Sequence, residues 1–336
     1  MCAEAFLRSA KIVVLDGHTL NPGDNGWEPV ASLGELTVYE RTPPELVLER
    51  ARKADILLTN KTILDAAVLA ELTQLHFISV TATGYNVVDV TAAGRQGIPV
   101  SNVPEYSTLT VAQHVFALLL ELTNRVGLHN DAVQSGEWSR CADFAFWKTP
   151  LVELAGQKLG IVGFGRIGQA VARIGWAMGM EILVHTPHPP LSGDPALRFV
   201  PLDELVATAD VISLHCPLTD SNAGFVNRSL LTGMKPSTFL INTARGGLVN
   251  EPDLAAALRK GTIAGAAVDV VSREPIAPDN PLLGAPNCLI TPHLAWASLA
   301  ARRRLMAQTA ANVAAFLAGE PVNVVNAIFL PPVAGA

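Results

Sequence analysis

The sequence predicts an α/β protein with two doubly wound domains, each built around a parallel β-sheet. Short apolar runs alternate with amphipathic stretches of helical spacing, which is the pattern of strands connected by helices. This alternation stops at a long apolar segment and then starts again. The 336 residues exceed one ordinary hydrophobic core and suit two domains of about 100–200 residues each. With 49% hydrophobic and 16% charged residues, the chain can fill two cores, which excludes intrinsic disorder.

In the first hundred residues, each expected strand is a short apolar run, and each expected helix has an apolar face. The turn Gly97-Ile-Pro ends one helix and opens the next strand. We expect strands near 11–15, 55–59, 76–81 and 98–101, and helices near 44–53, 64–72 and 88–96.

A long apolar helix from Thr108 to Val126 follows, and then a loop rich in aromatic residues from Trp138 to Trp147. The alternation then resumes, and a last helix over 297–318 lies beyond the final strand. We expect the strands of this second part near 158–162, 181–185, 210–215, 238–242, 264–269 and 288–291. The domain boundary is expected near 101–108.

Charge and composition exclude several classes of function. The formal net charge is −6, from 24 basic and 30 acidic residues, which argues against a nucleic-acid partner. No run of about 18 apolar residues without a charge predicts a membrane span. The four cysteines form no Cys-x-x-Cys pair, and no His, Cys and carboxylate cluster has metal-ligand spacing, so we expect neither a disulfide framework nor a metal. We see no export signal and expect a cytoplasmic protein.

The segment Gly163-Phe-Gly-Arg-Ile-Gly168 has the G-x-G-x-x-G spacing of a dinucleotide-binding turn. It follows an apolar strand and opens a helix expected over 167–178. In such a turn the first glycine permits a tight bend, the second lets the backbone approach a pyrophosphate, and the third lets the helix pack closely on the strand. The alternative is a glycine-rich βα turn without a ligand. Because strand and helix are both in place, we expect a bound dinucleotide, with contacts from Gly163, Phe164, Gly165, Arg166, Ile167 and Gly168.

The strand after this turn bears on the choice between NADH and NADPH. Its end normally carries an acidic residue that binds the ribose 2′-hydroxyl, but here the strand over 181–185 continues into Thr186-Pro-His188. A neutral Thr186 would not repel a 2′-phosphate, and His185 or His188 offers a hydrogen bond to one. No arginine stands between positions 173 and 198 to clamp it. We therefore expect NAD(P)H, with a slight lean to NADPH.

Three ionisable residues follow the ends of later strands. Arg245 stands after one buried strand, Glu274 follows the strand that ends at Asp269, and His293 follows the last one. The carboxyl ends of parallel strands line the ligand crevice of such a sheet. Each residue taken alone has a non-catalytic explanation. Arg245 could be a solvated surface charge, Glu274 a turn residue before proline, and His293 a packed, hydrogen-bonded histidine. Together they predict a catalytic group.

The chemistry of these three residues is complementary. A guanidinium binds a carboxylate with two parallel hydrogen bonds. A histidine exchanges a proton near neutral pH, and a neighbouring glutamate stabilises its charged form and fixes its tautomer. This combination suits hydride transfer between a nicotinamide ring and a 2-keto or 2-hydroxy acid.

Six motifs in order make the chain similar to the D-isomer-specific 2-hydroxyacid dehydrogenases along nearly its whole length. They are Ala82-Thr-Gly-Tyr-Asn-Val-Val-Asp89, Val162-Gly-Phe-Gly-Arg-Ile-Gly168, Leu214-His-Cys-Pro-Leu-Thr219, Asn242-Thr-Ala-Arg-Gly246, Asp269 to Pro275, and Thr291-Pro-His293. The resemblance implies a Rossmann-type dinucleotide-binding domain (102–295) inserted in a split flavodoxin-like substrate domain (1–101 and 296–336). It also implies a homodimer through the helix at 108–126 and the loop at 138–147.

The resemblance also assigns roles to residues. It implies that Arg245 binds the substrate carboxylate together with the backbone around Thr83 and Gly84, and that His293 is the acid–base residue paired with Glu274. It implies that Asp269 hydrogen-bonds the nicotinamide carboxamide. The further contacts that we expect are Val111, Thr186, Cys216, Pro217, Thr243, Ala244, Arg245 and His293 for the cofactor and Trp296 for the substrate.

Within the family, the Gly136-Glu-Trp138 loop and His293-Leu-Ala-Trp296 look most like glycerate dehydrogenases, which reduce hydroxypyruvate and glyoxylate. We therefore expect an oxidoreductase that reduces one of these small 2-keto acids to the D-2-hydroxy acid. The alternative is a non-catalytic protein of the same fold that senses dinucleotides, because a sensor can retain all three ionisable residues.

Overall fold

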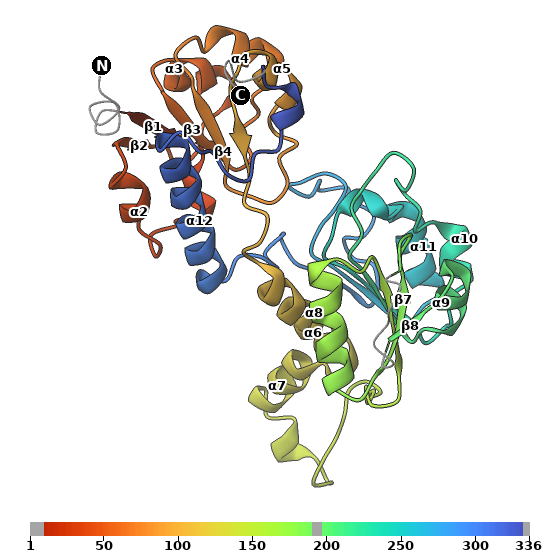
Figure 1. Ribbon diagram of the computed structural model, residues 1–336. Coiled ribbons are helices and arrows are strands. Elements are labelled where there is room, and N and C mark those ends of the chain that lie inside the picture. The colour runs from red at the N-terminus through yellow and green to blue at the C-terminus, as the bar shows by residue number, and fades with distance from the viewer. Residues whose placement is uncertain (1–9, 190–196, 332–336) are drawn as a thin grey trace. The chain divides into compact units, whose positions relative to one another are not determined.

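A computed structural model describes residues 10–189 and 197–331 and contains two parallel β-sheets, each in its own compact unit (Figure 1). The first unit holds the described residues up to Ser107 and from Ala297 onward, and the second runs from Thr108 to Trp296. The division after Ser107 lies within the range of 101–108 in which the sequence places the domain boundary. The predicted fold class, two doubly wound parallel α/β sheets, is confirmed.

The sheet of the first unit has the strand order β2-β1-β3-β4-β5, and all its pairs are parallel. This is the flavodoxin-like order. Its strands are β1 (Lys11–Val14), β2 (Glu35–Val38), β3 (Ile56–Thr59), β4 (Phe77–Val80) and β5 (Val100–Ser101). The strand β2 was not predicted, because it lies at the sheet edge with mostly exposed side chains and therefore has no apolar run.

The helices of the first unit are α2 (Glu28–Ala31), α3 (Val47–Ala51), α4 (Ala66–Glu71), α5 (Val90–Arg95) and α12 (Leu299–Leu317), with short 3₁₀ turns at Gly17–Thr19, Pro44–Leu46 and Ala327–Phe329. The last helix, α12, packs on β4, where Phe77 and Phe316 stack with ring centres 4.5 Å apart. Three of its side chains, Arg304, Gln308 and Asn312, are four residues apart and donate to the carbonyls of Tyr106, Glu105 and Asn102. These bonds tie residues 102–106 to the first unit.

The sheet of the second unit has the order β12-β11-β10-β9-β6-β7-β8, again entirely parallel. Its strands are β6 (Lys158–Val162), β7 (Glu181–His185), β8 (Leu197–Phe199), β9 (Val211–Leu214), β10 (Phe239–Asn242), β11 (Gly265–Val268) and β12 (Cys288–Ile290). The order reverses between β6 and β9, which is the topological switch point where such sheets bind ligands. The strand β8 was not predicted, because it has only three residues and lies at the edge.

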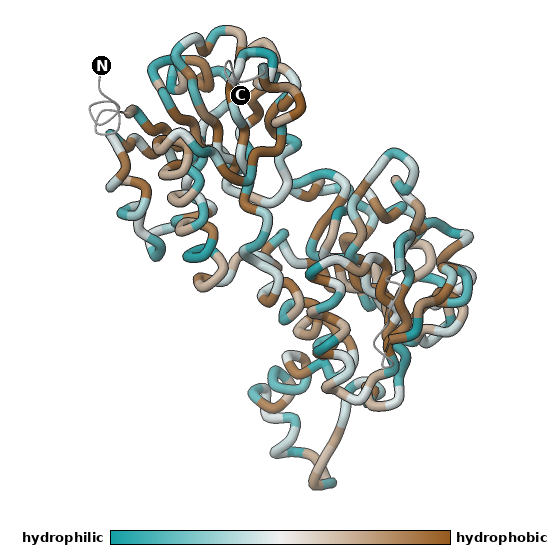
Figure 2. Tube along the Cα trace, viewed as in Figure 1, coloured by the Kyte–Doolittle hydropathy of each residue, from teal (hydrophilic) through white to brown (hydrophobic). Residues whose placement is uncertain are grey.

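Helices cover both faces of this second sheet, and Figure 2 shows its strands as largely hydrophobic. One buried cluster joins alternate strand residues to α6 and α8, and the other joins the remaining strand residues to α9, α10 and α11. The helices are α6 (Thr108–Asn124), α7 (Val126–Gln134), α8 (Arg166–Ala177), α9 (Leu202–Thr208), α10 (Arg228–Thr232) and α11 (Glu251–Lys260), with 3₁₀ turns at Trp138–Arg140 and Gly246–Leu248.

The prediction of one helix over 108–126 is wrong at its C-terminal end. It stops at Asn124, because Arg125 has a left-handed backbone with φ of 49°, and Val126 begins α7. The Arg125 guanidinium donates to Asn287 Oδ1 at 2.7 Å, which holds this break against the loop before β12. No helix in the described parts of the chain is long and apolar enough to cross a membrane.

Candidate active site

The catalytic residues expected from the sequence follow three neighbouring strands of the second sheet. In the paired registers, Asn242 of β10 lies beside Val268 of β11, and Val268 lies beside Ile290 of β12. Arg245 and His293 each stand three residues beyond the ends of β10 and β12. Parallel strands end at the same edge of the sheet, so the loops that carry Arg245, Glu274 and His293 leave from the same edge.

His293 and Glu274 form a direct pair. The ring Nδ1 of His293 lies 2.6 Å from Oε2 of Glu274, and the two side chains are 31% and 36% exposed. With the Nδ1 proton directed at the carboxylate, Nε2 is the nitrogen that exchanges a proton with a ligand. The pair is accessible to a small molecule and held in one tautomer, which suits an acid–base residue.

The turn that carries His293 is fixed by a buried carboxylate. Asp269 is 1% exposed, and it accepts hydrogen bonds from the Thr291 hydroxyl at 2.6 Å and from the backbone N–H groups of Leu294 and Ala295 at 2.9 Å each. His293 itself has φ of 52°, and its N–H donates to the Asp269 carbonyl at 2.8 Å. Asp269 therefore holds the main chain on both sides of His293. A contact with the nicotinamide carboxamide stays a prediction.

His114 extends this network from α6. Its Nε2 lies 3.1 Å from the Thr291 hydroxyl and 3.6 Å from Asp269 Oδ1. The residue is thus a hydrogen-bonded histidine at the edge of the core, as its apolar neighbours in the sequence indicate. Its contacts link the long helix to the turn that carries His293.

The turn that carries Arg245 is shaped by Asn242 and by Gly246. The buried Asn242 side chain accepts from Ala244 N–H at 3.0 Å and donates to the Arg245 carbonyl at 2.9 Å. A Cβ on Gly246 would lie 1.9 Å from the carbonyl carbon of Val271, so only glycine lets this turn approach the Glu274 loop. Arg245 is exposed, and no carboxylate among the described residues forms an ion pair with its guanidinium.

The glycine-rich turn has the geometry of an anion-binding loop. Gly163 has φ of 96°, and a Cβ on it would lie 2.5 Å from the Cys216 amide. A Cβ on Gly168 would lie 2.3 Å from the Gly163 carbonyl, which shows how closely α8 packs on the turn. Gly165 caps the start of α8, and nothing lies within 4 Å of the place where its Cβ would be. This open cradle at a helix N-terminus fits a pyrophosphate.

Neighbouring strand ends complete the surroundings of this turn. Burial lowers the pKa of His215 to about 4, so its ring is neutral near pH 7, and its Nε2 lies 2.8 Å from the Ser213 hydroxyl. Next to Thr186, the ring Nδ1 of His185 lies 3.2 Å from the Val200 carbonyl. Arg198 lies on β8 beside β7, and its guanidinium is paired with Glu204. The arginine that follows Thr186 in the sequence is thus already engaged.

The expected substrate-binding residues are divided between the two units. Thr83 and Gly84 follow β4 in the first unit, where the Thr83 hydroxyl donates to the Val103 carbonyl at 2.9 Å and the Thr83 carbonyl accepts from Asn102 at 2.7 Å. Trp296 and all the expected cofactor contacts belong to the second unit, with Val111 buried on α6.

Comparison with known proteins identifies the family. The family model for the D-isomer specific 2-hydroxyacid dehydrogenase, NAD binding domain, matches residues 116–295, which is more than half of the chain. This protein is a D-isomer-specific 2-hydroxyacid dehydrogenase. It is therefore an oxidoreductase with a nicotinamide cofactor, as the strand-end residues and the glycine-rich turn predicted.

The relatives of this dehydrogenase match most of its length. It is 48% identical to a hydroxypyruvate reductase of Blautia hydrogenotrophica over 94% of its own chain and 99% of that protein. It is 41% identical to a glycerate dehydrogenase of Methylorubrum extorquens, covering 87% and 92% of the two chains. Among solved structures, an NADPH-dependent glyoxylate/hydroxypyruvate reductase of Sinorhizobium meliloti, in complex with NADP and malonate, has a TM-score of 0.80 at 31% identity and covers 94% and 96%.

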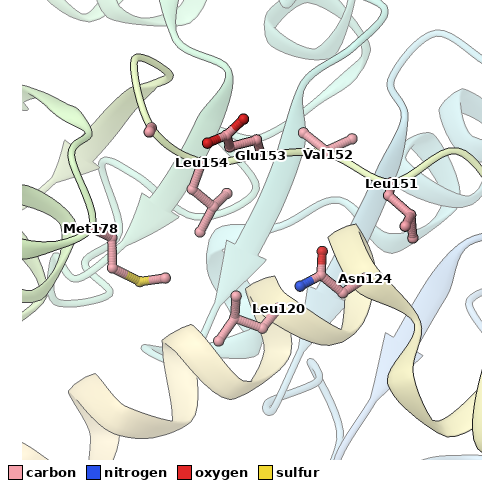
Figure 3. A pocket seen from close by; sticks show the side chains of 8 residues that line it. Leu120, Asn124, Leu151, Val152, Glu153, Leu154 and Met178 are labelled. Carbon is pink, nitrogen blue, oxygen red and sulfur yellow. The ribbon is translucent and has the colours of Figure 1, made fainter.

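A cavity of about 480 Å³ in the second unit of the dehydrogenase lies apart from the catalytic residues (Figure 3). Helix α6 supplies Leu120 and Asn124, and the segment over 151–155 lies opposite with Met178 at the end of α8. None of Arg245, Glu274 and His293 lines it. Its walls are mostly apolar, so it does not suit a small 2-keto acid.

Proposed function

We propose that this dehydrogenase uses NAD(P)H to reduce hydroxypyruvate to the D-2-hydroxy acid, D-glycerate, or glyoxylate to the achiral glycolate. The observation that carries the proposal is the 2.6 Å pair of His293 and Glu274 on a sheet edge that also carries Arg245, which forms no ion pair with a carboxylate of residues 10–189 or 197–331. The names of the Blautia and Methylorubrum relatives support hydroxypyruvate, and the name of the Sinorhizobium reductase supports both substrates. The dinucleotide-sensing alternative is not favoured, because these full-length relatives are named as enzymes.

Each residue of the site has one task in this reaction. The nicotinamide supplies the hydride to the carbonyl carbon when the cofactor is bound. His293 Nε2 gives a proton to the carbonyl oxygen, so hydride and proton together make the alcohol, and Glu274 stabilises the imidazolium beforehand. Arg245 binds the substrate carboxylate with two hydrogen bonds. The backbone at Thr83 and Gly84 binds the same carboxylate, and Trp296 borders the substrate.

The cofactor is assigned to the carboxyl edge of the second sheet. The amides of the turn from Gly163 to Gly168 and the N-terminus of α8 bind the pyrophosphate. Thr186 would then lie beside the ribose. The residues that would border the adenosine and the nicotinamide are Val111, Cys216, Pro217, Thr243, Ala244 and Asp269.

A substrate-by-cofactor matrix tests this function. The loss of absorbance of the reduced nicotinamide is measured with hydroxypyruvate, glyoxylate, pyruvate and phenylpyruvate, each with NADH and with NADPH. We expect hydroxypyruvate or glyoxylate to give the highest kcat/KM. Absence of turnover with all four acids and both cofactors overturns the proposal.

The choice of cofactor is expected to depend on Thr186. Thr186→Asp supplies a hydrogen-bond acceptor for the ribose diol and repels a 2′-phosphate, so the kcat/KM ratio of NADH to NADPH is expected to rise roughly tenfold or more, which corresponds to about 1.4 kcal/mol. The measurement is a pair of saturation curves for the wild type and the variant. Thr186→Asn is the matched control, because it has the shape of aspartate without the charge. A wild-type enzyme that strongly prefers NADH contradicts the lean to NADPH.

We also propose a homodimer through α6, α7 and the loop over 138–147. In Figure 1, α7 and this loop project from the body of the second unit. Large apolar side chains are exposed along this surface, at Leu109, Val126, Leu128, Val133, Trp138, Phe144, Trp147 and Leu151. Exposed large apolar side chains gathered on neighbouring elements are typical of an interaction surface, and a two-fold dimer is the commonest soluble assembly. Leu151 also lines the cavity described above.

Sedimentation velocity tests this assembly. The wild type is expected to sediment as a dimer at micromolar concentration, and Trp147→Glu as a monomer of 35.5 kDa, because a charge on a covered apolar face is costly to bury. Ile328→Glu is the control, since Ile328 is 86% exposed but belongs to the other unit. A wild type that sediments at 35.5 kDa contradicts the dimer.

A further inference from the structure

The loop that carries Glu274 is fastened by a second glutamate, Glu251, the first residue of α11. Glu251 is only 7% exposed. Its Oε1 accepts from Ser272 N–H at 2.6 Å, and its Oε2 accepts from the Ser272 hydroxyl at 3.0 Å and from Asn280 Nδ2 at 2.8 Å. Ser272 precedes Glu274 and Asn280 follows it, so one carboxylate holds the loop at both sides of the catalytic glutamate.

The buried, charged carboxylate of Glu251 depends on this loop for its stabilisation. Burying a carboxylate costs several kcal/mol unless hydrogen bonds or a cation compensate it. No lysine or arginine in the described ranges forms an ion pair with Glu251, and its position in the first turn of α11 adds only the favourable helix dipole. Its three hydrogen bonds therefore supply the main compensation, and all three come from the Glu274 loop.

The position of Glu274 in turn depends on the backbone that Glu251 holds. Val271 N–H donates to Glu274 Oε1 at 3.3 Å, while Oε2 lies 2.6 Å from His293 Nδ1. The adjoining backbone at Val271 and Ser272 also packs closely against Gly246. A shift of Ser272 away from Glu251 therefore moves the segment that orients the Glu274 carboxylate on the histidine.

We propose that Glu251 is a positioning residue for the acid–base pair, a role that rests on the proposed function of His293 and Glu274. Its three hydrogen bonds go to Ser272 and Asn280 and not to Glu274 or His293, so it acts on the pair through the loop. It keeps the 271–280 loop in the one arrangement in which the Glu274 carboxylate lies on His293 Nδ1. A purely structural role for Glu251 lowers thermal stability and leaves the protonation of His293 unchanged, so the two roles differ in a measurable way.

The test follows the protonation of His293 in Glu251→Gln. An amide keeps the acceptor for Ser272 but places its own NH₂ against the donor Nδ2 of Asn280, so the loop loses one attachment. We expect the NMR titration of the His293 ring, without substrate, to move to lower pH. The alkaline limb of kcat/KM for hydroxypyruvate reduction with NADPH is expected to move the same way, because reduction needs the imidazolium and its counter-charge has moved away.

Two further variants make this test specific. Asp253→Asn removes a charge from the same turn of α11, but Asp253 accepts from Arg228 and does not touch the loop, so we expect no shift. In the double variant Glu251→Gln with Asn280→Asp, the new amide NH₂ at position 251 faces the new carboxylate at position 280. The hydrogen bond is thus restored with its direction reversed, and the net charge equals that of the wild type. We expect this double variant to return both titrations toward the wild type, which a general loss of stability does not explain.

The outcomes separate this inference from the function on which it rests. If Glu274→Gln shifts the His293 titration and folded Glu251→Gln does not, the positioning role is overturned and the catalytic pair stands. If Glu274→Gln itself causes no shift, the catalytic pair fails. Should Glu251→Gln not fold, Asn280→Ala, which removes one of the three bonds, carries the test: a shift to lower pH supports the role, and no shift overturns it.

Discussion

Replacing His293 with alanine is expected to lower kcat for keto-acid reduction by about 10²–10⁴-fold, the usual contribution of a positioned acid–base group. Its Nδ1 is held by Glu274 at 2.6 Å, so Nε2 is the nitrogen that we propose protonates the carbonyl oxygen. The substrate carboxylate keeps its partner Arg245, so KM is expected to change little. Steady-state kinetics with hydroxypyruvate and NADPH separate the two constants.

The backbone at His293 decides which control is informative. Its φ of 52° lies in the left-handed region, where alanine is strained and asparagine is tolerated. His293→Asn therefore keeps the conformation of the turn and removes the proton-exchanging ring. We expect both variants to lose kcat equally, with the asparagine variant unfolding at a higher temperature. Near-wild-type turnover in His293→Asn contradicts the assignment of His293 as the acid.

The sequence predicted the parts of this protein that follow from buried strands. In a doubly wound sheet, each interior strand is a short apolar run, and the residues just beyond it must lie at the carboxyl edge. Arg245 and His293 were predicted in this way, and the structure places them beyond the ends of β10 and β12, the two strands on either side of β11. The glycine-rich turn was predictable because Gly163 and Gly168 answer backbone constraints that no other residue meets, while Gly165 leaves the space at the helix N-terminus open.

The features that the sequence did not predict depend on tertiary contacts. The edge strands β2 and β8 bury too little surface to leave an apolar run. The break after Asn124 depends on one left-handed residue, Arg125, whose partner Asn287 is distant in the chain. In the sequence, Glu251 looks like an ordinary acidic residue in the first turn of a helix. Its hydrogen bonds with Ser272 and Asn280 are formed only in the folded chain and leave no signal in the sequence.

The second large effect is expected at Arg245. Its guanidinium is exposed and has no ion-pair partner in the described part of the chain, so it is available to a substrate carboxylate. Hydrogen bonds to charged groups contribute about 1.5–3 kcal/mol each, and a guanidinium makes two of them. Arg245→Ala is therefore expected to lower kcat/KM by roughly 10²–10⁴-fold, with a raised KM as well as a lower kcat.

Comparison with lysine shows whether geometry or charge matters at this position. Arg245→Lys keeps the charge but not the planar pair of donors, so we expect it to recover only part of the lost kcat/KM. Arg228→Ala is the matched control, because it removes an exposed arginine from the same unit at the start of α10. Guanidinium ion added to Arg245→Ala is expected to restore part of the activity, since it refills the vacated carboxylate site. If Arg245→Ala and Arg228→Ala have the same KM for hydroxypyruvate, Arg245 does not bind the carboxylate.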